Sequence, residues 1–200
     1  MNNGNIGKNV PAGEVLPRAC GSCSLCCKVL RVDELHKLGG APCPQLRSSG
    51  GGCGIHPTRP SICRAYHCLW LQGGLEDEDR PDRLGAVTDL VSEGGMTRLA
   101  IREAFPGAFD TTPRLQDIAV LFRQTMPVRI SSTRDVLDPD APYRMLLPNG
   151  DTHEVSGEWT HVTHADGTTE RLRLPWLERR VRRLVVAVRR FRQRRSLPRD

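Results

Sequence analysis

The most regular pattern of apolar and polar positions lies in the stretch PRLQDIAVLFRQT, residues 113–125. Apolar side chains recur there with the 3.6-residue period of an α-helix, so that they would share one face. Thr112, just before the stretch, is of a residue type that caps helices, and Pro113 suits the first helical position. The pattern therefore predicts a helix over residues 113–125. The apolar face of that helix consists of Leu115, Ile118, Ala119 and Phe122.

Strand-like segments lie on both sides of this predicted helix. RLGAVTDLV and MTRLAIREAF are separated by SEGG, which predicts two strands, residues 83–91 and 96–104, joined by a glycine turn. The segment PVRISS after the helix is typical of a short strand. Further along, Asn149-Gly150 and Asp166-Gly167 stand between strand-like segments and predict two hairpin turns.

A second helical pattern lies at the end of the chain, in PWLERRVRRLVVAVRRFRQRRS. Its apolar residues are spaced by four, three, four and three positions, which predicts one apolar stripe flanked by arginines. Residues 177–200 contain ten arginines but only two acidic residues, a charge of +8 in a chain whose net charge is +6. The basic character therefore belongs to this tail. The stripe consists of Leu177, Val181, Leu184, Val188 and Phe191.

Three roles fit such a tail. The helix could dock its stripe on the sheet and leave its arginines in solvent. It could neutralise the phosphates of a nucleic acid, with a strong dependence on salt. It could also lie on an anionic membrane surface, where basic amphipathic helices bind. Aromatic residues make up only 4% of the chain, which is too few for a platform that stacks the bases of a single strand.

Together these patterns predict an α+β protein, in which a small cysteine-rich metal-binding module is followed by a small antiparallel sheet with one or two helices. We divide the 200 residues into four parts. Residues 1–18, rich in Asn and Gly, form a flexible leader. Residues 19–72 form the cysteine-cluster metal-binding module. Residues 73–174 form an α+β region with β-hairpins, and residues 175–200 form the basic amphipathic helix.

The chain shows no pattern of a secretory signal, since its first residues lack a basic segment followed by an apolar run. No window approaches 18 consecutive apolar residues, so the sequence predicts no transmembrane helix. We therefore expect a cytoplasmic protein. In a reducing compartment, clustered cysteines are metal ligands or redox groups more often than structural disulfides.

All eight cysteines lie between residues 20 and 70, about one residue in six of that segment. Four of them fall in CGSCSLCC, where a helix would bring Cys23, Cys26 and Cys27 onto one face. Three thiolates so close together repel one another unless a cation lies between them, and metal binding favours the deprotonated sulfur. The candidate ligands are Cys20, Cys23, Cys26, Cys27, Cys43, Cys53, Cys63 and Cys68.

His56 is a further candidate ligand, because Cys53 and His56 are separated by two residues, a spacing that lets both reach one ion. It could equally be a histidine that orients its loop by hydrogen bonds. Eight thiols exceed the four ligands of one tetrahedral ion. Two four-ligand sites, one polynuclear site plus a second metal, or one site with spare cysteines all remain open.

Sulfur ligands suit zinc and iron–sulfur clusters alike. The run CGSCSLCC departs from the bacterial ferredoxin pattern, which needs a fourth Cys three residues after the third and then Pro. The segment also lacks the histidine pair of a two-Cys, two-His zinc finger. Arg59 and Arg64 are expected to offset thiolate charge or to hydrogen-bond the loop.

The series CGSCSLCC, PCPQL and GCGIHPTRPSICRAYHC resembles the CxxCxxCC cysteine-cluster family (YkgJ-like proteins). The resemblance covers about residues 20–70, roughly a quarter of the chain. It implies a zinc- or iron-chelating domain in which the eight cysteines are the ligands. It also implies motif positions at His56, Arg59, Pro60, Arg64 and Tyr66, with no assigned role.

Two functions follow as hypotheses. In the first, the chain is a cysteine-cluster metalloprotein that chelates iron, as ions or as an iron–sulfur cluster, or zinc, with a redox or metal-handling role. In the second, the metal is structural, and residues 177–200 contact a protein, a nucleic acid or an anionic membrane. The sequence shows no hydrolase triad, P-loop or dinucleotide-binding motif, identifies no small-molecule substrate, and leaves open whether the chain is an enzyme.

Overall fold

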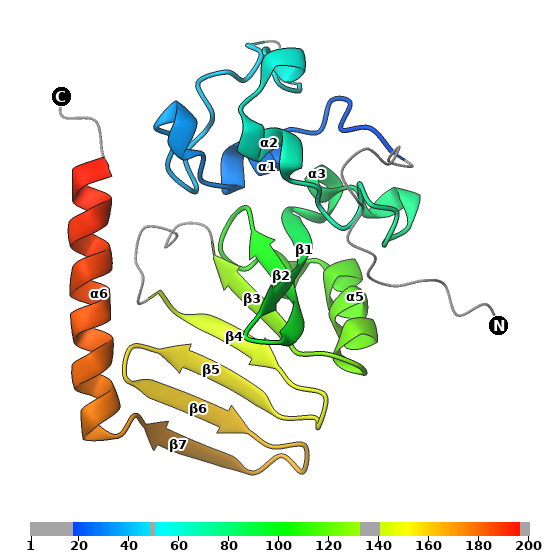
Figure 1. Ribbon diagram of the computed structural model, residues 1–200. Coiled ribbons are helices and arrows are strands. Elements are labelled where there is room, and N and C mark those ends of the chain that lie inside the picture. Colours follow the sequence, from blue (N-terminus) through cyan, green and yellow to red (C-terminus); the bar gives the residue numbers. More distant parts are fainter. Residues whose placement is uncertain (1–17, 49–50, 133–140, 197–200) are drawn as a thin grey trace.

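The computed structural model describes residues 18–48, 51–132 and 141–196 and contains one seven-stranded sheet (Figure 1). The strands lie in chain order, and all neighbours are antiparallel except β2 and β3, which are parallel. The prediction of an α+β protein is confirmed, but the prediction of a small antiparallel sheet is wrong. The strands are β1 Ala86–Glu93, β2 Met96–Glu103, β3 Val128–Ser132, β4 Tyr143–Leu146, β5 Thr152–Ser156, β6 Trp159–Thr163 and β7 Thr169–Arg173.

The described residues form six α-helices, more than the one or two that the sequence predicted. Four of them are single turns. The helix predicted over residues 113–125 and the terminal helix are both present, as α5 and α6. The α-helices are α1 Leu25–Val29, α2 Ser61–Ala65, α3 Pro81–Leu84, α4 Ala108–Thr111, α5 Pro113–Arg123 and α6 Trp176–Ser196. The 3₁₀ turns are η1 Asp33–Leu35, η2 His56–Thr58 and η3 Asp77–Asp79.

The predicted turns are confirmed, because glycines occupy the left-handed backbone region that they require. Gly94 and Gly95 connect β1 to β2 with φ of 60° and 81°. Gly150 and Gly167 lie in the β4–β5 and β6–β7 turns. The first strand begins later than predicted, at Ala86, because residues 81–84 form α3 and end at Gly85 with φ of 70°.

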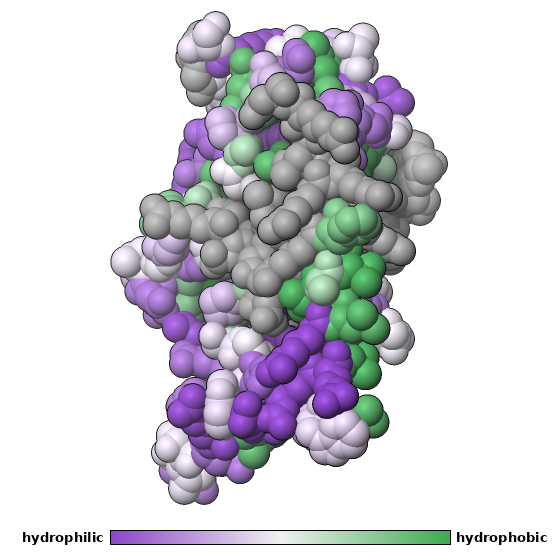
Figure 2. Space-filling view, turned by 90° about the vertical axis from the view of Figure 1, so that its left-hand side faces the viewer, coloured by the Kyte–Doolittle hydropathy of each residue, from purple (hydrophilic) through white to green (hydrophobic). Residues whose placement is uncertain are grey.

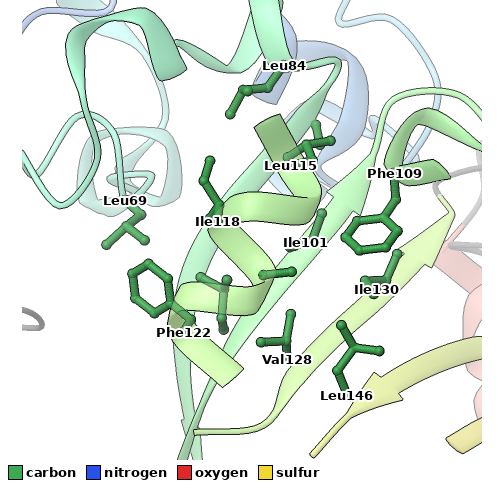
Figure 3. Packing of buried hydrophobic residues seen from close by; sticks show 13 residues of the cluster. Leu69, Leu84, Ile101, Phe109, Leu115, Ile118, Phe122, Val128, Ile130 and Leu146 are labelled. Carbon is green, nitrogen blue, oxygen red and sulfur yellow. The ribbon is translucent and has the colours of Figure 1, made fainter. Parts of the chain in front are cut away.

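The parallel pairing of β2 with β3 requires a crossover, which α4 and α5 provide on one face of the sheet (Figure 1). All four residues of the predicted apolar face of α5 are buried there. They pack with Ala86 of β1 and with side chains of β2, β3 and β4. Figure 3 labels Ile101, Val128, Ile130 and Leu146 of these three strands. The cluster comprises Leu69, Leu84, Ala86, Leu99, Ile101, Phe109, Leu115, Ile118, Ala119, Phe122, Val128, Ile130 and Leu146.

Successive residues of β1 point to opposite faces of the sheet. Ala86 packs on the α5 side, whereas Val87 packs against Leu25 and Val29 of α1 on the other side. All three of the latter side chains are buried. The helix that carries Cys26 and Cys27 is therefore fixed directly on the sheet.

The predicted flexible leader lies outside the described residues except for its last residue. Arg18 donates hydrogen bonds to the backbone carbonyls of Trp70 (2.7 Å) and Leu75 (2.8 Å) and pairs with Asp77. Its guanidinium also lies over the Trp70 ring, 5.1 Å from the ring centre. The start of the cysteine-bearing segment is thereby attached to the chain that follows it.

None of the helices in the described ranges combines the length and the apolar character needed to cross a bilayer.

Asp79, at the end of η3, is fully buried and therefore needs partners for its charge. It accepts two hydrogen bonds from the guanidinium of Arg114, both 2.7 Å, and one from the backbone N–H of Glu76. Burial alone would raise the pKa of this carboxyl, but the Arg114 and Glu76 donors outweigh it, so the pKa is lowered. The pair links the segment before β1 to α5.

We expect Arg114→Gln to lower the free energy of unfolding by about 2–3 kcal/mol near pH 7, because it leaves a buried carboxylate without its cation. A carboxyl with a lowered pKa stabilises the fold above its unfolded pKa of about 3.9 and loses that effect as the pH falls. The difference between wild type and variant should therefore shrink below about pH 3. Urea unfolding at both pH values measures it.

The matched control is Arg83→Gln, which removes an exposed arginine of the neighbouring helix α3. This control should change stability by no more than about 0.5 kcal/mol. Equal stabilities for the two variants would contradict the structural role given to the Arg114–Asp79 pair.

Candidate metal centre

Helix α1 positions the pair Cys26 and Cys27. Leu25 and Val29, four residues apart, point to the sheet and are 8% and 1% exposed. The two cysteines between them are half-buried and line a cavity. The helix begins at Leu25, so Cys23 precedes it, and the backbone N–H of Cys23 donates to the carbonyl of Cys20 (2.9 Å) across a turn at Gly21.

The glycine-rich loop around Cys53 packs closely on the loops that carry Cys20 and Cys43. A Cβ atom on Gly52 would lie 3.0 Å from the carbonyl oxygen of Gly21, and one on Gly54 would lie 3.1 Å from that of Gln45. Gly52 also has φ of 79°, which side chains disfavour. Glycine at these positions permits backbone segments far apart in sequence to approach each other.

Backbone contacts place Cys43 and Cys53 beside α1. The N–H of Cys43 donates to the carbonyl of Cys27 at 3.0 Å. Leu46 and Cys53 form an isolated β-bridge, which brings the two loops into register. Cys43 is buried, at 8% exposed.

Helix α2 carries Cys63, and η2 carries His56. The Arg59 guanidinium donates to the carbonyls of both residues, at 3.2 Å to Cys63 and 2.8 Å to His56, and so connects the two turns. Ser61, at the start of α2, donates to Glu34 of η1 at 2.9 Å. These contacts hold α2 against the remainder of the cysteine-bearing loops.

Seven of the eight predicted cysteine ligands line one cavity of about 370 Å³. His56 and Arg59 line it as well, together with Lys37, Tyr66, Asp89 and Arg102. Cys68 lies in a second cavity of about 30 Å³, which it shares with three of the same cysteines and with Tyr66. The seven are Cys20, Cys23, Cys26, Cys27, Cys43, Cys53 and Cys63.

All eight cysteines are free thiols. Within the described residues, no three Cys, His, Asp or Glu side chains are placed so that they could hold a single metal ion. The structure thus brings seven of the predicted ligands to the walls of a shared cavity, but no three of them converge on one point. The prediction of metal ligation stays a prediction.

The thiols of the cavity differ in acidity. The S–H of Cys26 donates to the sulfur of Cys27, which raises the pKa of Cys26 and lowers that of Cys27 to about 7. The positive charges of Lys37 and Arg59 also lower the pKa of Cys27. Burial raises the pKa of Cys20, Cys23, Cys63 and Cys68, that of Cys68 to about 11. One thiolate at neutral pH is therefore favoured at Cys27.

Lys37 is the cation that sequence reasoning missed. It is only 3% exposed, and its ammonium group donates to the backbone carbonyls of Leu30 and Leu38. Burial lowers its pKa, and thiolate charge at Cys43, Cys27, Cys26 and Cys63 would oppose that effect. A lone lysine in the polar stretch DELHKLGG carries no signal of burial, since only the folding of the loop over α1 encloses it.

The sheet contributes part of the wall of the same cavity. Arg102 of β2 and Asp89 of β1 form an ion pair there, and burial raises the pKa of Asp89 despite that partner. Tyr66 is packed beside them, and burial raises its pKa as well. The Tyr66 side chain lines both cavities, and its buried hydroxyl lies close enough to the Asp89 carboxyl to lower the pKa of that group. Strand periodicity predicted β1 and β2 but could not show that this face meets the cysteines.

Comparison of the chain with protein-family models, with curated proteins and with solved structures gave no match. The resemblance to the CxxCxxCC cysteine-cluster family therefore rests on the spacing of the motif residues alone.

We expect Cys27 to be the first thiol alkylated when metal-free protein meets iodoacetamide near pH 7, because the thiolate is the nucleophile. A pKa of about 7 leaves half of Cys27 deprotonated at that pH. Near pH 5 the rate should fall by about fiftyfold as the thiolate is protonated. Mass spectrometry of digests at successive times measures each site.

Cys26→Ala removes the S–H donor and should slow the alkylation of Cys27 several-fold near pH 7. Cys68→Ala is the control, because Cys68 is not among the groups that set the pKa of Cys27. Equal rates at Cys27 and Cys68 in the wild type would contradict the predicted order of reaction.

Proposed function

We propose that this chain is a cysteine-cluster metalloprotein that holds iron, as ions or as an iron–sulfur cluster, or zinc, through its cysteine thiolates. The observation that carries the proposal is the single cavity lined by seven cysteines from separate segments of the chain. Free structural cysteines are usually scattered and buried in apolar surroundings. Here most are half-buried and face a common space.

The charges around the cavity suit a bound group with several thiolate ligands. Four thiolates on one divalent ion sum to a net charge of −2, which nearby cations reduce. Lys37 and Arg59 occupy such positions, and Arg102 lines the same cavity. The buried hydroxyl of Tyr66, in the wall of the same cavity, is a further polar group that could donate a hydrogen bond to the sulfur atoms of a bound cluster.

The size of the cavity favours a group larger than one ion. Its volume of about 370 Å³ is many times the roughly 30 Å³ that one water molecule occupies in the liquid. A polynuclear cluster or two ions would use more of the thiols than a single tetrahedral ion. An iron–sulfur cluster, when bound, would supply one-electron transfer, whereas zinc would supply cross-links between the loops.

Binding requires the loops to close on the group, since their sulfur atoms do not converge on one point. The elements that carry the cysteines are short: α1 and α2 are five residues each, and the other cysteines lie in loops. Small shifts of such loops cost less than shifts of the sheet. Metal binding and local folding of residues 20–68 would then be coupled.

The test is the metal and acid-labile sulfide content of the full chain purified without oxygen, with its visible and electron-resonance spectra. We expect at least about one metal ion per chain, with removal by a chelator lowering the melting temperature. Colourless protein that holds no metal, and whose melting temperature a chelator leaves unchanged, would overturn the proposal.

Variants locate the ligands. Cys27→Ser and Cys63→Ser should each lower the metal content by about half or more, because serine oxygen is a poor substitute for thiolate. His36→Ala, which removes an exposed imidazole outside the cavity, is the matched control. His56→Ala decides between a ligand and a histidine that only orients its loop. Deletion of residues 177–200 should leave the metal content unchanged.

A further inference from the structure

Helix α6 is amphipathic, but its apolar stripe faces away from the protein. Leu184 is 67% exposed, Leu177 59% and Val181 55%, and Val188 is exposed as well. The side of the helix turned toward the protein carries half-buried Arg179, Arg182 and Val186 instead. Surface helices of globular proteins normally bury the apolar stripe. The expectation that this helix docks its stripe on the sheet is therefore wrong.

The arginine side is held by ion pairs to one carboxylate. Glu158, in the turn between β5 and β6, accepts hydrogen bonds from Arg183 of α6 at 2.9 Å and from Arg173 of β7 at 3.1 Å. Arg179 lies 3.9 Å from the same carboxylate. The backbone N–H of Leu174 donates to the Glu158 carbonyl at 3.0 Å, just before the helix begins. These contacts orient the stripe toward solvent.

On the face of the molecule that carries α6, Figure 2 shows a green hydrophobic band beside a purple hydrophilic one. The helix contains nine arginines and one acidic residue, Glu178. At its start, Trp176 is 64% exposed, with the Arg180 guanidinium 5.8 Å from the centre of its ring. Arg180 and Arg183 are exposed as well, so the stripe shares the solvent-facing surface of the helix with these two cations.

Three occupants would meet this surface differently. A second copy of the helix would cover the stripe but would bring two sets of arginines together, with little acidic charge to oppose them. A nucleic acid would pair with the arginines and leave the apolar side chains in water. An anionic bilayer would contact both the arginines and the stripe, since its headgroups carry negative charge and its acyl boundary takes up apolar side chains.

We propose that α6 is a docking surface for an anionic lipid bilayer. The helix lies in the plane of the membrane, with the stripe in the acyl boundary and the flanking arginines at the headgroups. Its 21 residues span about 31 Å at the rise of an α-helix. Trp176 sits at the headgroup level, where tryptophan is enriched. The proposal does not depend on metal binding in the cysteine cavity.

The test is co-sedimentation of the full chain with lipid vesicles. We expect binding to phosphatidylcholine vesicles that contain about 30% phosphatidylglycerol and weak binding to phosphatidylcholine alone. Raising the salt to about 0.5 M should weaken the binding several-fold. The double variant Leu177→Ser and Leu184→Ser should lower the affinity for anionic vesicles about tenfold or more. A shift of the tryptophan fluorescence to shorter wavelength on vesicle binding, lost in Trp176→Phe, would support burial of the helix start.

The matched control is Val120→Ser with Leu121→Ser, which removes two exposed apolar side chains from α5 instead. It should bind vesicles like the wild type. Equal losses in both double variants, or no binding of wild type to anionic vesicles, would overturn the proposal. A stripe variant that keeps full affinity for vesicles would also overturn it. So would a protein that binds no vesicles but forms a dimer that requires the stripe. Tight binding of a duplex oligonucleotide with no vesicle binding would assign the arginines to nucleic acid.

Discussion

Leu25 and Val29 of α1 pack against Val87 of β1, and this contact supports the wall of the cysteine cavity. The backbone of a five-residue helix does not persist alone in water, so α1 depends on its tertiary contacts. Because β1 is paired with β2 along its whole length, it offers α1 a rigid surface. Loops that carry Cys43 and Cys53 are then positioned by backbone bonds that start from α1.

Charge is the second constraint on the same region. Thiols that face one cavity cannot all ionise unless cations compensate them. The protein places Lys37 and Arg59 beside the thiols and Arg102 on the sheet wall, and it favours a thiolate at Cys27 by the S–H donor of Cys26. These compensating charges are therefore in place before the proposed metal group binds.

Much of the regular structure could be predicted from local patterns. The 3.6-residue period marked α5 and its buried face, and glycine pairs marked the β1–β2 turn, because both depend on backbone geometry within a few residues. The short turn at Gly157 between β5 and β6 lacks a paired turn signal and was not predicted. The parallel pairing of β2 with β3 was also missed, since it depends on a crossover rather than on either strand.

By itself the sequence determined which side chains are available: eight thiols in one segment, the periodic face of α5, and a basic helix with one apolar stripe. Spacing along the chain is enough for these, because neighbouring residues constrain each other through short stretches of backbone. Only the tertiary structure decided that Lys37 is buried beside the thiols and that the arginine side of α6 turns inward to Glu158. Those outcomes depend on contacts between residues far apart in the chain. The pattern of neighbouring residues carries no information about the free energies of such contacts.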